Sequence, residues 1–107
     1  MEPILLVLSN LPDRERALKL AAALVEERLA ACVNVLGECT SLYRWQGAVK
    51  SAAEVPVLIK TRESLYARVE ETIRKLHPYE VPELIALRVD RGLPAYLQWV
   101  LEESAGG

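Results

Sequence analysis

The chain has 107 residues, 51% of them hydrophobic, which favours one compact domain over residues 1–107. Its 13 Lys and Arg and 15 Asp and Glu give a formal net charge of -2, so there is no excess positive charge for a nucleic-acid backbone. No apolar run approaches the roughly 18 residues of a membrane span, and no secretory signal opens the chain. Composition therefore argues against nucleic acid and membrane as main partners and favours a cytoplasmic protein.

The first half of the chain carries patterns for a strand, a helix and a second strand. Residues 4–8 form a continuous apolar run, which is typical of a buried strand. Asp13 is a good helix cap, and apolar residues at helical spacing predict a helix over residues 13–29. Alternation then predicts one long strand over residues 31–45, with a bulge at Gly37.

A hairpin is expected in the middle of the chain. Residues 46–48 can close it, and the alternating apolar residues 55–59 read as its return strand. Pro56 lacks a backbone donor, so we expect it at an edge or bulge near a strand end.

The second half repeats the helix-then-strand pattern. Apolar spacing predicts a helix over residues 65–76 that ends before Pro78, because the residue preceding a proline avoids helical dihedrals. Residues 81–89 read as a fourth strand. Pro94 suits the first turn of a short helix that continues over residues 95–103.

The order of these elements predicts an α+β fold. Strand, helix, strand, strand, helix, strand is the ferredoxin-like βαββαβ order with an antiparallel sheet, here followed by an extra C-terminal helix. Right-handed crossovers put both main helices on one face of the sheet, yet the strands carry apolar residues on both faces, as Leu6 and Leu8 do in the first. One short helix cannot cover the second face, so the sequence predicts self-association.

Metal-ligating residues are few. His77 is the only histidine, and with Glu80, Glu83 or a cysteine it offers donors that suit copper or zinc. Cys32 and Cys39 are seven residues apart, so they lie on opposite faces if their strand is regular. Two cysteines do not make a disulfide framework and are read as free thiols of a reducing compartment. A purely structural role for all three residues remains open.

Three further features have two interpretations each. Residues 77–83 are either a turn fixed by two prolines or a binding loop. Tyr43 and Trp45 are more simply core or interface aromatics than ligand contacts. In residues 60–62, a helix cap by Thr61 is a simpler reading than an anion site.

Five linked motifs run in order along nearly the whole chain: Arg28–Asn34, Thr40–Gly47, Lys60-Thr61, residues 77–83 and Tyr96–Trp99. With them the chain resembles CutA, the divalent-cation-tolerance protein family. The resemblance implies a ferredoxin-like fold and an intertwined homotrimer similar to the nitrogen-regulatory signal transducers. It also implies a role linked to copper and other divalent cations, with no established catalytic activity.

Residue by residue, the resemblance makes His77 the candidate metal ligand, with Cys32 and Cys39 as thiolate contributors. It also implies a cleft between subunits, whose candidate residues are Tyr43, Trp45, Lys60, Tyr79 and Trp99. The chain departs from some members after the first strand, where Ser9 and Asn10 stand in place of a thiol.

Three functions follow as hypotheses. The first is a non-enzymatic trimeric protein that binds Cu(II) or a similar divalent ion and takes part in the response to metal ions. The second is a trimeric small-molecule sensor whose inter-subunit cleft binds an anionic metabolite near Lys60 and Arg62. The third is an acylphosphatase-like hydrolase, which needs a glycine-rich loop with an arginine after the first strand. Residues 9–13 supply neither, so we expect no enzyme.

Overall fold

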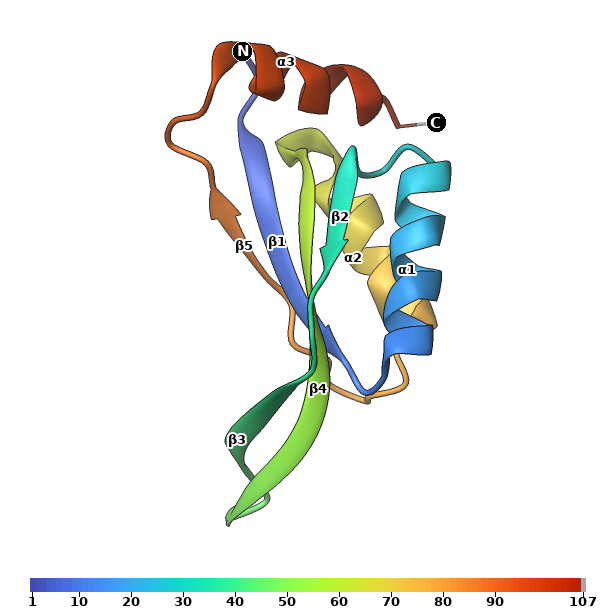
Figure 1. The fold of residues 1–107 in the computed structure, drawn as a ribbon, viewed down its shortest axis with the longest axis vertical. Coiled ribbons are helices and arrows are strands. Elements are labelled where there is room, and N and C mark those ends of the chain that lie inside the picture. The colour runs from blue at the N-terminus through green and yellow to red at the C-terminus, as the bar shows by residue number, and fades with distance from the viewer. Residues whose placement is uncertain (107) are drawn as a thin grey trace.

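An antiparallel sheet forms the body of the protein, with two helices packed on one face and a third helix across one end (Figure 1). The computed structural model describes residues 1–106. Its elements are β1 (Ile4–Leu11), α1 (Arg14–Glu26), β2 (Cys32–Val35), β3 (Cys39–Trp45), β4 (Ala48–Arg62), a 3-10 turn (Glu63–Leu65), α2 (Tyr66–Leu76), β5 (Ile85–Arg88) and α3 (Pro94–Glu103).

The sheet topology confirms the predicted fold class. The strand order is β2-β4-β1-β5, and each neighbouring pair is antiparallel. Both α1 and α2 lie on the same side of the sheet and contact each other, as right-handed crossovers require (Figure 1). This is the ferredoxin-like arrangement, with α3 as the additional element.

The long strand predicted before the hairpin is interrupted, and the interruption is a bulge. Val35 pairs with Val57 and Cys39 pairs with Glu54, so three residues of one strand face two residues of β4. The extra residue falls in the segment that contains Gly37, where the bulge was predicted. The prediction of one continuous strand is therefore wrong, and the register shifts by one residue between β2 and β3.

This shift changes where the two cysteines lie. Cys32 pairs with Lys60 and Cys39 with Glu54, which are both even-numbered residues of β4 and share one face of that strand. The expectation of opposite faces was conditional on a regular strand. The bulge makes the strand irregular and places the two cysteines on the same face.

Pro56 lies opposite the bulge, as one predicted alternative had it, but it is inside β4 and not near a strand end as predicted. The return strand begins at Ala48, well before Val55, and continues past Pro56. The backbone amide of Leu36 donates to the carbonyl oxygen of Pro56 over 2.9 Å. In a strand the amide and carbonyl of one residue point to the same neighbouring strand. The nitrogen of Pro56, which has no hydrogen to donate, therefore faces the bulge, where the hydrogen bonds between the strands are already interrupted.

Helix boundaries differ only slightly from the predictions. The Asp13 side chain accepts a hydrogen bond from the backbone amide of Arg16 and caps α1 as expected. That helix ends at Glu26 and not near residue 29, because Arg28 adopts a left-handed conformation with φ of 58°. None of the helices in residues 1–106 is long and apolar enough to cross a membrane.

Two strand lengths also differ. The first strand continues to Leu11, because Ser9 and Asn10 still pair with β4. The last strand covers only Ile85–Arg88, and residues 81–84 belong to the preceding loop.

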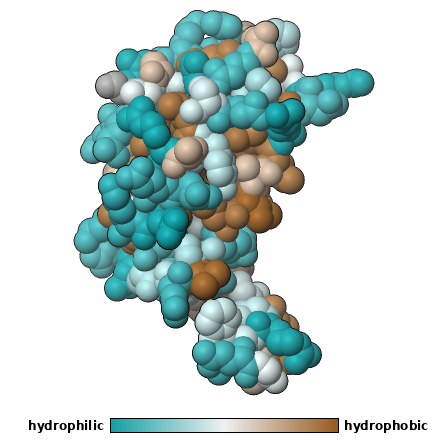
Figure 2. Space-filling model, turned by 180° about the vertical axis from the view of Figure 1, so that it is seen from behind, coloured by the Kyte–Doolittle hydropathy of each residue, from teal (hydrophilic) through white to brown (hydrophobic). Residues whose placement is uncertain are grey.

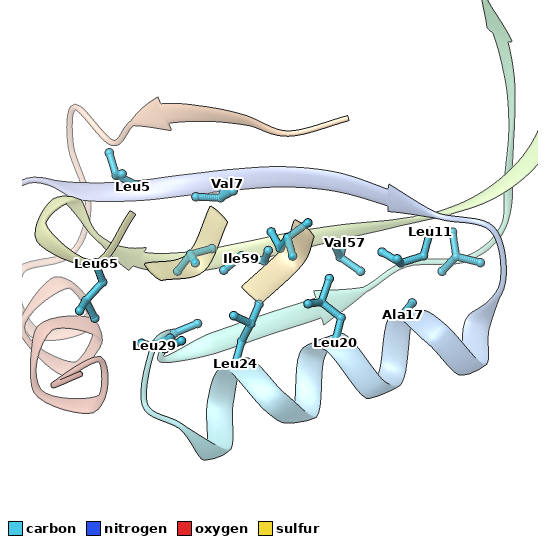
Figure 3. Packing of buried hydrophobic residues seen from close by; sticks show 14 residues of the cluster. Leu5, Val7, Leu11, Ala17, Leu20, Leu24, Leu29, Val57, Ile59 and Leu65 are labelled. Atoms are coloured by element: carbon cyan, nitrogen blue, oxygen red, sulfur yellow. The ribbon is translucent and has the colours of Figure 1, made fainter. Parts of the chain in front are cut away.

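The hydrophobic core lies between the sheet and the two helices on its face (Figure 3). Its fully buried members include Val7, Leu11, Leu20, Leu24, Val57, Ile59, Val69 and Ile73. Alternate residues of β1 and β4 supply the sheet side, which is the pattern of a strand with one face in the core.

The other face of the sheet, called here the open face, is apolar and only partly covered. The pairing of β1 with β4 and β5 places five apolar side chains next to one another on this face: Leu6, Leu8, Leu58, Ile85 and Leu87. The two β5 side chains are more than half exposed, at 52% and 54%. Figure 2 shows apolar surface gathered on the side of the molecule where β5 lies. The third helix contacts only one end of β1 and β4 (Figure 1), so the prediction of apolar residues on both faces is confirmed.

Candidate functional site

The loop between α2 and β5 is fixed to the end of β1, and His77 is its first anchor. The imidazole Nε2 lies 2.6 Å from the carbonyl oxygen of Asn10, and the backbone amide of Tyr79 donates to Nδ1 over 3.2 Å. A carbonyl only accepts, so Nε2 carries the proton and donates. Both ring nitrogens of this buried side chain, 7% exposed, are therefore occupied by backbone groups.

Ser9 and Asn10 hold the far end of the same loop. The Ser9 hydroxyl donates to the carbonyl oxygen of Glu83 over 2.7 Å, and the Asn10 side-chain amide donates to the Glu83 carboxylate over 3.1 Å. The sequence analysis noted these two residues only as a departure from family members that have a thiol after the first strand. They fix the loop against the sheet.

The β3–β4 hairpin, residues 39–54, projects from the body of the protein (Figure 1). A pocket lies between this hairpin and the loop at residues 79–83. Its volume is about 660 Å³, which is within the usual range for small-molecule sites. Hairpin and loop line it together, through Ser41, Leu42, Tyr43, Trp45, Glu54, Tyr79, Glu80, Val81, Pro82 and Glu83. We call it the hairpin-root pocket.

Glu54 is the one strongly buried carboxylate in this pocket, with 8% of its surface exposed. The hydroxyl of Tyr79 interacts with it. Burial raises the pKa of Tyr79 above its ordinary value of 10.0, and the Glu54 carboxylate raises it further. Sequence reasoning missed Glu54, because its burial depends on a loop that is distant in the chain. Its place directly before the apolar residues 55–59 was the only available signal.

Three of the five predicted cleft residues meet in this pocket, and two do not. Tyr43, Trp45 and Tyr79 line it, which joins the hairpin to the loop at residues 77–83. Lys60 and Trp99 lie outside it, the first on the open face and the second on α3.

Each of these two residues has other neighbours. The Lys60 ammonium donates to the Asn34 side chain and lies 3.9 Å from the Cys32 sulfur. The Trp99 ring packs against Tyr96, with centroids 5.7 Å apart.

The segment at residues 60–62 has a structural role. The Thr61 hydroxyl is fully buried and donates to the carbonyl oxygen of Leu29 over 2.6 Å, so the predicted helix cap is wrong. Arg62 pairs with Glu2 and donates to the carbonyl oxygen of Leu101 in α3. These bonds tie α3 to the sheet.

The three predicted metal ligands are not brought together within one chain. Among residues 1–106, no group of three His, Cys, Asp or Glu side chains is arranged to hold a metal ion. Cys32 and Cys39 are free thiols of intermediate exposure. The Cys39 sulfur lies 3.8 Å from the Ser41 hydroxyl. Within a single chain the thiols are the available soft donors, because His77 already uses both nitrogens.

Comparison with known proteins gives consistent matches over nearly the whole chain. The family model described as CutA1 divalent ion tolerance protein matches residues 5–103. The divalent-cation tolerance protein CutA of Thermus thermophilus is 44% identical over 104 residues, which is 97% of this chain and 99% of that protein. Protein CutA of Mus musculus is 48% identical over 89 residues, or 83% of this chain, but this chain spans only 50% of the mouse protein.

Solved structures agree with the sequence matches. The divalent cation tolerance protein of Thermus thermophilus has a TM-score of 0.90 at 46% identity, covering 96% of this chain and 98% of that one. CutA from Xylella fastidiosa has a TM-score of 0.91 at 42% identity, covering 94% and 96%. The fold and the sequence as a whole are thus similar to those of proteins named for tolerance of divalent cations.

Proposed function

The chain belongs to the CutA1 divalent ion tolerance protein family, and from this membership we propose that it binds copper or a similar divalent ion as a homotrimer and takes part in the response to metal ions. The open face is the single observation that carries the proposal. It supports assembly directly, and assembly in turn decides where a metal can bind.

The assembly follows from the energetics of the open face. A monomer seldom leaves a continuous apolar patch of a few hundred Å² in water, because each Å² of apolar surface removed from water contributes about 25 cal/mol. Leu6, Leu8, Ile85 and Leu87 are neighbours on this face, and the two β5 side chains are more than half exposed in one chain. A closed ring of three copies buries this face, and three is the number implied by the family resemblance.

Metal binding needs donors from more than one copy. Residues 1–106 of one chain contain no group of three ligands, so a site inside a single chain does not fit the donor set. Cys32 lies on the open face beside Lys60, and Cys39 lies on the projecting hairpin. Assembly can bring such thiols together, whereas His77 must first release the Asn10 carbonyl or the Tyr79 amide. We therefore rank Cys32 and Cys39 as the first candidate donors and His77 as the last.

The proposed role is non-enzymatic and cytoplasmic. His77 is the chain's only histidine, and because both its nitrogens hold backbone groups it is poorly placed as a general base. Two unpaired cysteines suit a reducing compartment. Reporter fusion and fractionation of the native host test the location, and a membrane or secreted fraction would contradict it.

One experiment tests assembly and metal binding in sequence. Light scattering coupled to size exclusion is expected to give about three times the chain mass of 11.9 kDa. Copper is then titrated into the trimer by calorimetry, for the parent, Cys32→Ser, Cys39→Ser and His77→Gln. Loss of binding in a thiol variant supports the proposed donors. A mass of one chain at micromolar concentration, or no copper binding by the parent, contradicts the proposal.

A small-molecule sensor is the second candidate function. The hairpin-root pocket favours it, because Tyr43 and Trp45 of β3 meet Tyr79 of the α2–β5 loop there. Binding of an anionic metabolite at Lys60 and Arg62 has less support, since both cations already have partners in the fold.

A further inference from the structure

The lining of the hairpin-root pocket has a marked chemical bias. It contains three aromatic rings and three carboxylates among ten residues, but no lysine or arginine. The rings belong to Tyr43, Trp45 and Tyr79, and the carboxylates to Glu54, Glu80 and Glu83. Such a lining repels anions and attracts cations.

The negative charge in the pocket lacks a cationic partner in the fold. None of the three carboxylates forms an ion pair within residues 1–106. Glu83 accepts a hydrogen bond from a neutral amide, and Glu54 meets a neutral phenol. Burying a carboxylate without a cation is costly, and Glu54 is more than nine-tenths buried. A bound cation would offset that cost.

The aromatic rings distinguish an organic cation from a metal ion. The faces of Trp and Tyr attract an ammonium group through their quadrupoles, and methylated ammonium groups gain most because they are weakly hydrated. A bare divalent ion instead requires several converging oxygen or sulfur donors. No such group of three occurs in residues 1–106, this pocket included.

The remaining lining suits a short hydrocarbon skeleton. Leu42, Val81 and Pro82 add apolar surface next to the rings. The hairpin cations Arg44 and Lys50 are exposed and do not line the pocket. The ligand therefore combines one positive group with a small apolar body.

We propose that the hairpin-root pocket binds a small organic ammonium ion, with the charge held by Glu54 and the alkyl groups packed on Tyr43, Trp45 and Tyr79. This inference deepens the second candidate function by naming its ligand class, and it reverses the anionic ligand expected at Lys60 and Arg62. It rests on that candidate's site and not on the copper proposal.

Choline and its neutral carbon analogue 3,3-dimethylbutan-1-ol are the matched probes, because they differ chiefly in the positive charge. Calorimetry on the assembled parent protein is expected to give saturable choline binding. The alcohol should bind at least about tenfold more weakly, because it lacks the charge needed for the cation–aromatic and charge-assisted contacts. Glu54→Gln keeps the side-chain shape and is expected to weaken choline binding by about tenfold.

Two further variants keep the test decisive. Glu26→Gln removes an exposed carboxylate from α1, outside the pocket, and should bind choline like the parent. If Glu54→Gln does not assemble, Glu80→Gln replaces it, with a smaller expected loss because Glu80 is exposed. Absence of choline binding by the parent, equal binding of the alcohol, or an unchanged affinity in the folded pocket variant overturns the proposal. Copper binding by the same samples is a separate readout, so its failure contradicts only the metal proposal.

Discussion

The imidazole of His77 donates from Nε2 to the carbonyl oxygen of Asn10 over 2.6 Å, and so joins the start of the α2–β5 loop to the end of β1. The residues are 67 positions apart, and the ring is buried. This hydrogen bond gives the only histidine of the chain a structural role, whatever it contributes to metal binding.

His77→Ala should therefore destabilise the protein. It leaves the Asn10 carbonyl and the Tyr79 amide without a partner, and an unsatisfied buried polar group costs about 1–3 kcal/mol. Urea unfolding at fixed protein concentration measures the loss. His77→Gln retains an amide donor and should recover part of it. Equal stability of His77→Ala and the parent would show that the bond contributes nothing.

The order of the elements and their faces could be predicted from the sequence because hydrophobic periodicity is a local property. Apolar spacing was enough to find both main helices, and apolar residues on both faces of β1 and β5 indicated an uncovered face. Strand ends were less predictable. Ser9 and Asn10 look like a strand terminus, but pairing with β4 extends the strand through them.

Site residues were predictable only where they formed a motif. Tyr43, Trp45 and Tyr79 were found through the family resemblance, and they do share a pocket. Glu54 was missed, because a glutamate in a strand is ordinarily solvated and nothing local indicates that Tyr79 will interact with it. The cleft predicted at Lys60 lies between subunits, and in one chain the strand register places this residue on the open face.

Alkaline pH should destabilise the protein partly through Tyr79. Its pKa is raised in the folded state, first by burial and then by Glu54, so the folded protein holds the phenolic proton more tightly than the unfolded chain. The resulting stability is complete below the ordinary pKa of 10.0 and is lost as pH rises through the higher folded value.

Tyr79→Phe should accordingly flatten the fall in unfolding free energy as pH rises above about 10, the ordinary pKa of a phenol. The pKa of Tyr66 is also raised, by burial and by Glu70, so the unfolding free energy of the variant should still fall slightly with rising pH. Urea titrations across this range provide the test. An alkaline slope identical to that of the parent would rule out Tyr79 as a contributor.

Trp45→Ala should weaken the assembly more than the fold of one chain. The ring is 41% exposed within a chain, so it is not part of the core, and its hairpin projects from the body. A neighbouring copy that packs on the part of the ring outside the hairpin-root pocket would lose that apolar contact, and complete burial of a Trp sets an upper limit of about 3–5 kcal/mol for the loss. Dissociation should therefore begin at a higher protein concentration than in the parent, as read by light scattering on a dilution series. Leu18→Ala, at an exposed position of α1, is the control.

Leu87→Glu is expected to prevent trimer formation while leaving the single chain folded. The side chain is 54% exposed in one chain, so a carboxylate there remains solvated in a monomer. In a trimer that buries the open face, the same carboxylate would lose its water without a cationic partner, which is far more costly. Leu18→Glu introduces the same charge at a 47% exposed position on α1, away from the open face, and should leave the mass unchanged. Light scattering reports the mass and circular dichroism the helix content. If Leu87→Glu keeps the parent mass and melting temperature, the copies do not meet through β5 and the open face has another role.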